Sequence, residues 1–156
     1  MVGDATVIEI AENPIDPVRA LADFESGIRG SGAIASFLGK VRDNAAGSEV
    51  RGLFLEHYPG VTEKSIEGIV GAAHERWPLD ATLVIHRVGM VAAHEPIVFV
   101  CAASAHRRAA FEATDFLMDF LKTEALFWKK EVRSDGEVWI EPRSQDYLDA
   151  NRWRND

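Results

Sequence analysis

The segment PIVFVCAA at residues 96–103 constrains the fold most, because it is almost entirely apolar. A short apolar run of this kind is typical of a strand that lies inside a sheet with both faces covered. A second β-rich run, TLVIHRV, occupies residues 82–88. Three further segments have strand-like patterns and are expected to form strands: residues 6–11, 33–39 and 50–57.

Three other segments carry the signals of helices. Asp16-Pro17 is typical of an N-cap followed by proline at the first helical position, with Gly27 as the stop. Thr62 is expected to cap a second helix, and Ser104 is expected to open a third. The buried stripe of this third helix is predicted to comprise Phe111, Thr114, Phe116, Leu117, Met118, Phe120 and Leu121.

Length and composition fit one domain over residues 1–156, with 47% hydrophobic and 27% charged residues. No stretch approaches the roughly 20 uninterrupted apolar residues of a membrane span, and we expect no secretory signal. Strands and helices are mixed without a strict βαβ rhythm, which predicts an α+β fold. The last third is expected to add one short strand at WIEP and a polar surface tail over about residues 143–156.

Charge and cysteine content exclude several classes of function. Lys and Arg number 17 against 25 Asp and Glu, a net charge of −8, which disfavours binding of nucleic acid through its phosphates. Cys101 is the single cysteine and cannot form an internal disulfide, which is typical of a reducing, cytoplasmic location. The histidines show no metal-ligand spacing, so we expect no metal and no other cofactor.

Positive side chains nevertheless gather in three places: at Lys40 and Arg42, at His106, Arg107 and Arg108, and at Lys122 with Lys129 and Lys130. The second group falls in the first turn of a predicted helix, where each cation costs about 0.3–1 kcal/mol because of the helix dipole. The placement makes sense where an anion docks at the helix end. The alternative is that these residues are solvated or pair with Glu112 and Asp115 one turn later.

Lys122 and Lys129 are seven positions apart and would share a face if the helix continued through TEALFW. The apolar residues 126–128 between them could desolvate an ammonium group, which suits proton transfer or nucleophilic use. The alternative is that both lysines extend into solvent from the end of an amphipathic helix. Cys101 is expected to be a buried small hydrophobic residue rather than a nucleophile. The residues alone therefore favour a cationic site for a small phosphorylated ligand and name no reaction.

At these residues the sequence resembles the large, catalytic subunit of molybdopterin synthase, the MoaE family. The segments that carry the resemblance cover about residues 33 to 140 in the family's order: FLGKVRD at 37–43, LEHYPGVTE at 55–63, IHRVG at 85–89, SAHR at 104–107 and LKTEALFWKKE at 121–131.

The resemblance implies an α+β fold of the hammerhead kind, with mixed and antiparallel sheets, and a homodimer within a heterotetramer. It implies as partner a small ubiquitin-like subunit whose C-terminal Gly-Gly ends in a thiocarboxylate. Two sulfur transfers from this tail to cyclic pyranopterin monophosphate would form the dithiolene of molybdopterin. The resemblance assigns catalysis to Lys122, the family's principal catalytic lysine, and to Lys129. It assigns substrate or tail contacts to Lys40, Val41, Arg42, His106, Arg107, Lys122, Lys129, Lys130 and Glu131.

Two residues depart from the family pattern, and two other functions stay open. Leu126 stands where the family usually has proline, so a further helical turn is permitted there, and Val61 stands where methionine is frequent. One alternative function is a non-catalytic module that binds a phosphorylated ligand or a partner's acidic tail. The other is a persulfide sulfurtransferase that uses Cys101.

Overall fold

The computed structural model describes residues 6–155, and its main sheet has the strand order β1–β5–β7–β2. These strands span Thr6–Ala11 (β1), Leu79–Arg87 (β5), Pro96–Ser104 (β7) and Ala33–Lys40 (β2). β1 is parallel to β5, whereas β7 is antiparallel to both of its neighbours. The apolar segment at 96–103 is therefore an interior strand, as predicted.

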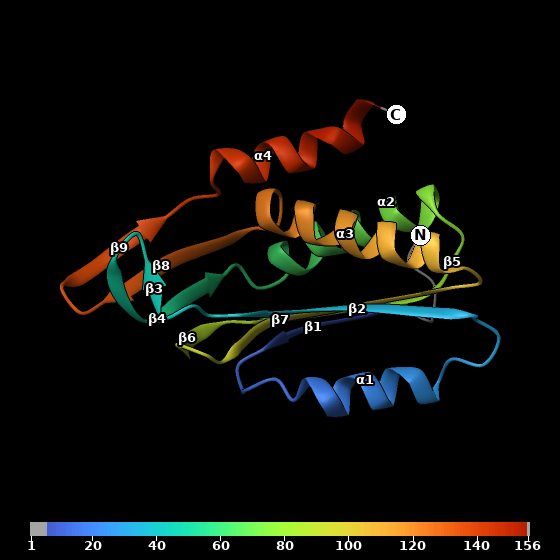
Figure 1. The fold of residues 1–156 in the computed structure, drawn as a ribbon, viewed down its shortest axis with the longest axis horizontal. Helices are drawn as coiled ribbons and strands as arrows, with labels where there is room; N and C mark the ends of the chain where they lie inside the picture. Colours follow the sequence, from blue (N-terminus) through green and yellow to red (C-terminus); the bar gives the residue numbers. More distant parts are fainter. Residues whose placement is uncertain (1–5, 156) are drawn as a thin grey trace.

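Helices cover both faces of this sheet (Figure 1). Helix α1 (Pro17–Ser26) lies on one face, and helices α2 (Val61–Arg76) and α3 (Arg107–Thr123) lie on the other. Alternate residues of β7 enter two cores: Val98 and Val100 pack with α2 and α3, while Phe99 and Cys101 pack toward α1. Burial on both faces explains why this strand has almost no polar residue.

A second, antiparallel sheet lies at one end of the first (Figure 1), in the order β3–β4–β8–β9, with β6 paired to β4. Its strands span Asn44–Ala45 (β3), Ser48–His57 (β4), Phe127–Arg133 (β8), Gly136–Ile140 (β9) and Gly89–Ala92 (β6). The prediction of an α+β fold with mixed and antiparallel sheets is confirmed. The predicted short strand at WIEP overlaps the end of β9, whereas β6 and β8 were not predicted.

The polar segment after residue 143 folds into helix α4 (Ser144–Asn151) and a 3-10 turn, η1 (Arg152–Asn155), which lie against α3 (Figure 1). Asp119 of α3 accepts hydrogen bonds from Arg152 at 2.9 Å and from the Trp153 indole at 2.6 Å. Ala150 and Asp146 are buried. Within the described part of the chain, no helix combines the length and apolarity that a membrane crossing requires.

Two predicted helix starts are wrong because the hydroxyl groups have tertiary partners. Helix α2 is capped by Gly60, whose positive φ of 83° favours glycine and whose N–H donates to Glu63 at 3.0 Å. Thr62 is buried inside α2 and donates to the Leu126 carbonyl at 2.6 Å. Ser104 ends β7 and donates to the Pro78 carbonyl at 2.8 Å, so the residue that precedes α3 is His106.

The predicted stripe of α3 is confirmed except at Met118, which is only partly buried, and at Phe111, which is 65% exposed. The small residues Ala110 and Ala113 are buried in its place. The condition under which Lys122 and Lys129 would share a helix face is not met, because α3 ends at Thr123 and β8 begins at Phe127. β8 pairs with β4 from its first residue, and this pairing takes the segment away from the helix.

Candidate active site

The predicted cationic residues lie at the two ends of α3. His106 and Arg107 stand at its N-terminus, whereas Lys122 lies in its last turn. Lys122 follows Arg107 by 15 residues, which corresponds to about 22 Å along the helix axis. One copy of the chain therefore does not bring these two groups to a single site.

The topology collects several predicted residues at the C-terminal end of α3. Because β2 and β5 are antiparallel to β7, and α3 runs back along β7, both strands end near the end of α3 (Figure 1). Lys40 ends β2, and His86 lies next to the end of β5. Lys129 comes to the same place from β8 and Asp146 from α4, close enough for the Asp146 carboxylate to raise the pKa of Lys129 and for the Lys122 ammonium to lower that of Asp146. We call Lys122, Lys129, His86 and Asp146 the lysine cluster.

Burial and a neighbouring charge alter the basicity of Lys129. Burial lowers its pKa to about 8, the Lys122 ammonium adds to this shift, and Asp146 opposes it. A lysine with this pKa is about one-tenth neutral at pH 7. The prediction that one of these lysines is desolvated is therefore met at Lys129, although Leu126 and Trp128 are exposed and only Phe127 of the apolar block lies at the cluster.

His86 is a buried, uncharged side chain beside the two lysines. Its ring is 5% exposed, stacks on Phe127 at 4.2 Å between centroids, and its Nδ1 lies 2.9 Å from the Arg87 carbonyl oxygen. Burial, together with the charges of Lys129 and Lys122, lowers the pKa of His86 to about 3. A neutral ring that donates through Nδ1 carries an unprotonated Nε2.

Asp146 balances part of the positive charge of the cluster. It accepts hydrogen bonds from the Arg143 backbone N–H at 2.8 Å and from the Arg143 guanidinium at 3.3 Å. Burial opposes ionisation of Asp146, but these hydrogen bonds and the charges of Lys122 and Arg143 outweigh it and hold its pKa below the ordinary value. Sequence reasoning missed Asp146 and Arg143. The available signal was an acid three residues after a proline-arginine pair, the spacing of a helix start.

Residues of β8 alternate between the two faces of the second sheet. Lys129 and Glu131 lie on one face, and Glu131 accepts a hydrogen bond from Arg133. Lys130 lies on the other face, above the rings of Phe54 and Trp139, with its ammonium 2.9 Å from Glu137. The structure therefore separates Lys130 from the lysine cluster.

The N-terminus of α3 borders a hollow of about 470 Å³ lined by Gly32, Ala105, His106, Arg107 and Arg108. A Cβ on Gly32 would overlap the Ala105 carbonyl oxygen, so this close approach requires glycine. The three cations are exposed, and the alternative pairing with Glu112 and Asp115 is not found among the described residues. Glu112 accepts from the Trp77 indole, and Asp115 pairs with Arg152. Unpaired cations at a helix N-terminus fit an anion.

Val41 anchors the turn that carries the third cationic group. Its side chain is buried, its N–H donates to the Glu95 carbonyl at 3.0 Å, and its carbonyl accepts from His94 at 2.7 Å. Lys40 and Arg42 project on either side of this anchor and are exposed. The Val41 side chain therefore serves the core and presents its two neighbours.

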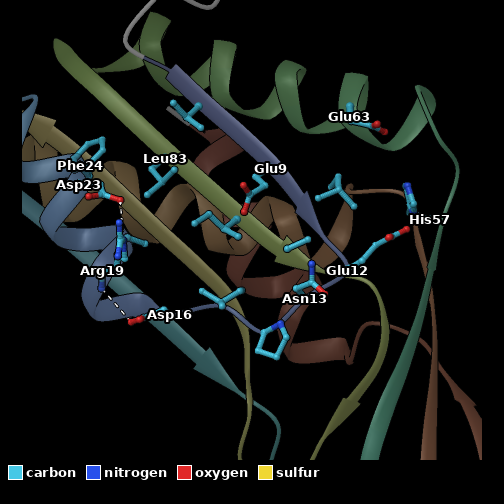
Figure 2. A pocket seen from close by; sticks show the side chains of 17 residues that line it. Glu9, Glu12, Asn13, Asp16, Arg19, Asp23, Phe24, His57, Glu63 and Leu83 are labelled. Carbon is cyan, nitrogen blue, oxygen red and sulfur yellow. Dashed lines mark hydrogen bonds and ion pairs between the residues drawn. The ribbon is translucent and has the colours of Figure 1, made fainter.

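Another hollow has the wrong charge for an anion. It measures about 760 Å³ and lies between α1 and the adjacent strands β1 and β5 (Figure 2). Its lining includes Glu9, Glu12, Asp16, Asp23 and Glu63, against Arg19 and His57 as the basic groups. No predicted site residue lines it. Among the residues that the structure describes, no three potential metal ligands lie close enough together to hold an ion.

Cys101 is fully buried, and burial raises the pKa of its thiol to about 12. A thiol that is neither ionised nor accessible is a poor nucleophile. These observations argue against the persulfide alternative.

The MoaE protein family matches residues 10–124 of this chain. The chain belongs to the MoaE family. The molybdopterin synthase catalytic subunit of Pseudomonas aeruginosa is 48% identical over 146 residues, which are 94% of this chain and 97% of that protein. Family membership confirms the expectations of an enzyme and of a role in molybdopterin biosynthesis.

Solved structures of the family share the fold. The molybdopterin biosynthesis MoaE protein from Burkholderia ambifaria superposes with a TM-score of 0.81 at 41% identity, covering 96% of this chain and 98% of that one. A chain of the complex of subunits 1 and 2 of molybdopterin-converting factor from Helicobacter pylori has a TM-score of 0.72. It is only 18% identical, with 90% and 92% of the two chains covered, and shows the fold alone.

Proposed function

We propose that this MoaE chain transfers sulfur from the C-terminal thiocarboxylate of a small ubiquitin-like subunit to cyclic pyranopterin monophosphate, forming the dithiolene of molybdopterin. The observation that carries the proposal is the lysine cluster, where Lys129 has a pKa of about 8 beside the exposed ammonium of Lys122. A thiocarboxylate and a phosphate are both anions, and a chain with a net charge of −8 presents positive side chains for them at both ends of α3.

Each group has a role that follows from its surroundings. His106 and Arg107, with the free N–H groups of the first turn of α3, bind the phosphate. Lys122 holds the thiocarboxylate in line or moves a proton at the reacting centre, and Lys129 exchanges a proton close to neutral pH. Lys40, Arg42, Lys130 and Glu131 are contacts to substrate or tail by family resemblance. Positioning and charge stabilisation supply most of the rate.

The two ends of α3 meet in this proposal across a homodimer. About 22 Å of helix separates Arg107 from Lys122. The side chains that bind the phosphate and the lysines of the same site therefore come from different copies. A small subunit bound to each copy makes a heterotetramer. The Helicobacter pylori complex, which joins a chain of this fold with a second subunit, supports a heteromeric assembly.

Replacing Lys122 with alanine tests the proposal. With a thiocarboxylated small subunit and the pterin precursor, dithiolene formation should fall by at least about 100-fold, because the group at the reacting centre is lost. Circular dichroism and gel filtration should show an unchanged fold and partner complex. Lys64→Ala, at an exposed position of α2, is the matched control and should keep full turnover.

Near-normal turnover of Lys122→Ala would remove Lys122 from the mechanism. Binding of both reactants by the unmodified chain without product would favour the non-catalytic module. Loss of turnover in Cys101→Ala, with the fold intact, would favour the persulfide enzyme.

A further inference from the structure

The second sheet has an exposed aromatic hollow on the face opposite Lys129. Its volume is about 350 Å³, and it is lined by Glu56, Tyr58, Trp128 and Trp139, which we call the aromatic cradle. Trp128 is 54% exposed, Trp139 57% and Tyr58 45%. Three large aromatic side chains with half of their surface in solvent are unusual unless they bind something.

Strand register builds the aromatic cradle. Glu56 of β4 is opposite Trp128 of β8, and Trp139 of β9 is opposite Lys130 of β8. The two indoles have centroids 6.3 Å apart and planes at 78°, so they form two walls of a corner. The carboxylate of Glu56 belongs to the same hollow, which combines aromatic surfaces with a negative charge.

The same face of the sheet already holds one cation. The Lys130 ammonium lies 5.4 Å from the Phe54 ring centroid, 5.2 Å from that of Trp139 and 2.9 Å from the Glu137 carboxylate. Two rings and a carboxylate are therefore sufficient here to hold a positive group. The aromatic cradle shares Trp139 with this site and adds Trp128, Tyr58 and the Glu56 carboxylate.

The Lys130 ammonium lies over one side chain of the aromatic cradle, Trp139, but the other side chains of the cradle have no positive partner among the described residues. Within the part of the chain described, Glu56 has no ion pair, and neither Tyr58 nor Trp128 has a cation above its ring. A guanidinium is planar, stacks on aromatic rings and donates two parallel hydrogen bonds to a carboxylate. Its shape and charge match these two walls and Glu56.

We propose that the aromatic cradle binds an arginine side chain of a protein partner, stacked on Trp128 and paired with Glu56. A protein is favoured as the source because the apolar surface continues past the hollow to Met90, which is 47% exposed and pairs with Phe54. Exposed Trp and Tyr side chains beside an arginine are typical of the energetic centres of protein interfaces. The net charge of −8 also attracts a basic partner.

The proposal is tested on the full chain with a peptide that carries one arginine between two leucines. The matched peptide has citrulline, which keeps the shape and removes the charge. Indole N–H resonances of Trp128 and Trp139 should shift on addition of the arginine peptide, whereas those of Trp77 and Trp153, packed around Phe116, should not. The citrulline peptide should bind at least about threefold more weakly, because the cation–π and ionic contributions are lost.

Variants separate this surface from the catalytic proposal. Glu56→Gln and Trp128→Leu should each weaken binding of the arginine peptide by about threefold or more. Glu67→Gln, at an exposed position of α2, should leave its affinity unchanged, and so should Lys122→Ala. Equal affinity for both peptides, unchanged binding by Glu56→Gln, or binding of N-acetylarginine amide as tight as that of the peptide would overturn the proposal.

Discussion

The two ends of α3 carry the same kind of charge in opposite surroundings. At the N-terminus, His106 and Arg107 are exposed and border an open hollow. At the C-terminus, Lys129 is packed with a buried His86 and a buried Asp146. Exposed positive side chains can attract an anion, whereas a desolvated lysine can also exchange its proton near neutral pH. Charge therefore identifies where a ligand binds, and burial identifies where protons can move.

Mixing two inactive variants tests whether the two ends of α3 from different copies form one site. Lys122→Ala removes the positive side chain at one end of α3, and Arg107→Ala removes the one at the other end. Each homodimer should therefore be inactive. After subunit exchange at equal amounts, half of the dimers are mixed and contain one intact site of two, which should restore about a quarter of the original dithiolene formation. A Lys122→Ala/Arg107→Ala double variant mixed with either single variant is the control and should restore nothing. Absence of any recovery would show that the two ends do not share a site.

The desolvation of Lys129 should appear in the free energy of unfolding. The pKa of Lys129 is about 8 in the folded chain against 10.5 for the free side chain, so the folded state binds its proton less well. The resulting destabilisation is complete below pH 8 and disappears as the pH rises toward 10.5. Lys129→Met should therefore stabilise the chain by about 1–3 kcal/mol at pH 7.

Urea unfolding of Lys129→Met and of the original chain at pH 7 and pH 10.5 measures this difference. The increase in the free energy of unfolding that Lys129→Met causes should largely vanish at pH 10.5. Arg107→Met at the exposed end is the matched control, and its effect should stay within about 0.5 kcal/mol at pH 7. An equal gain from Lys129→Met at both pH values would contradict the desolvation of this lysine.

The smallest effect is expected at the turn between the two lysines. The Phe127 N–H donates to the Ala125 carbonyl at 3.1 Å, and Leu126 between them is not among the residues with positive φ. This is an inverse γ-turn, whose central φ suits proline. Proline would remove the hydrogen bond that the Leu126 N–H donates to the Ser65 hydroxyl at 3.3 Å, so Leu126→Pro should lower the free energy of unfolding by about 0.5–1.5 kcal/mol. A loss of about 3 kcal/mol, the cost of proline inside a helix, would show that α3 extends through this segment.

Local patterns predicted the elements that depend on local interactions. The apolar β7, the Asp16-Pro17 start of α1 and most of the buried stripe of α3 follow from periodicity and capping. The hydroxyls of Thr62 and Ser104 were misassigned because their partners, Leu126 and Pro78, are distant in sequence. A cap and a tertiary hydrogen bond use the same side chain, and spacing alone does not separate them.

The candidate site was predictable in its residues but not in its arrangement. Unpaired cations in an acidic chain and the family resemblance both point to His106, Arg107, Lys122 and Lys129. The environment of Lys129 depends on the pairing of β8 with β4 and on α4, which are contacts between distant segments. The separation of Arg107 from Lys122 could have been found, because both residues lie on the one helix whose length the apolar stripe indicates.

The anchoring of α4 also acts at a distance from its own contacts. Asp119 holds Arg152 and Trp153 at one end of this helix, while the opposite end supplies Asp146 to the two lysines. The position of Asp146 therefore depends on the attachment of the other end of the segment to α3. Weakening that attachment would let the Asp146 carboxylate move away from Lys122 and Lys129. The pKa of Lys129 would then fall, although neither lysine is altered.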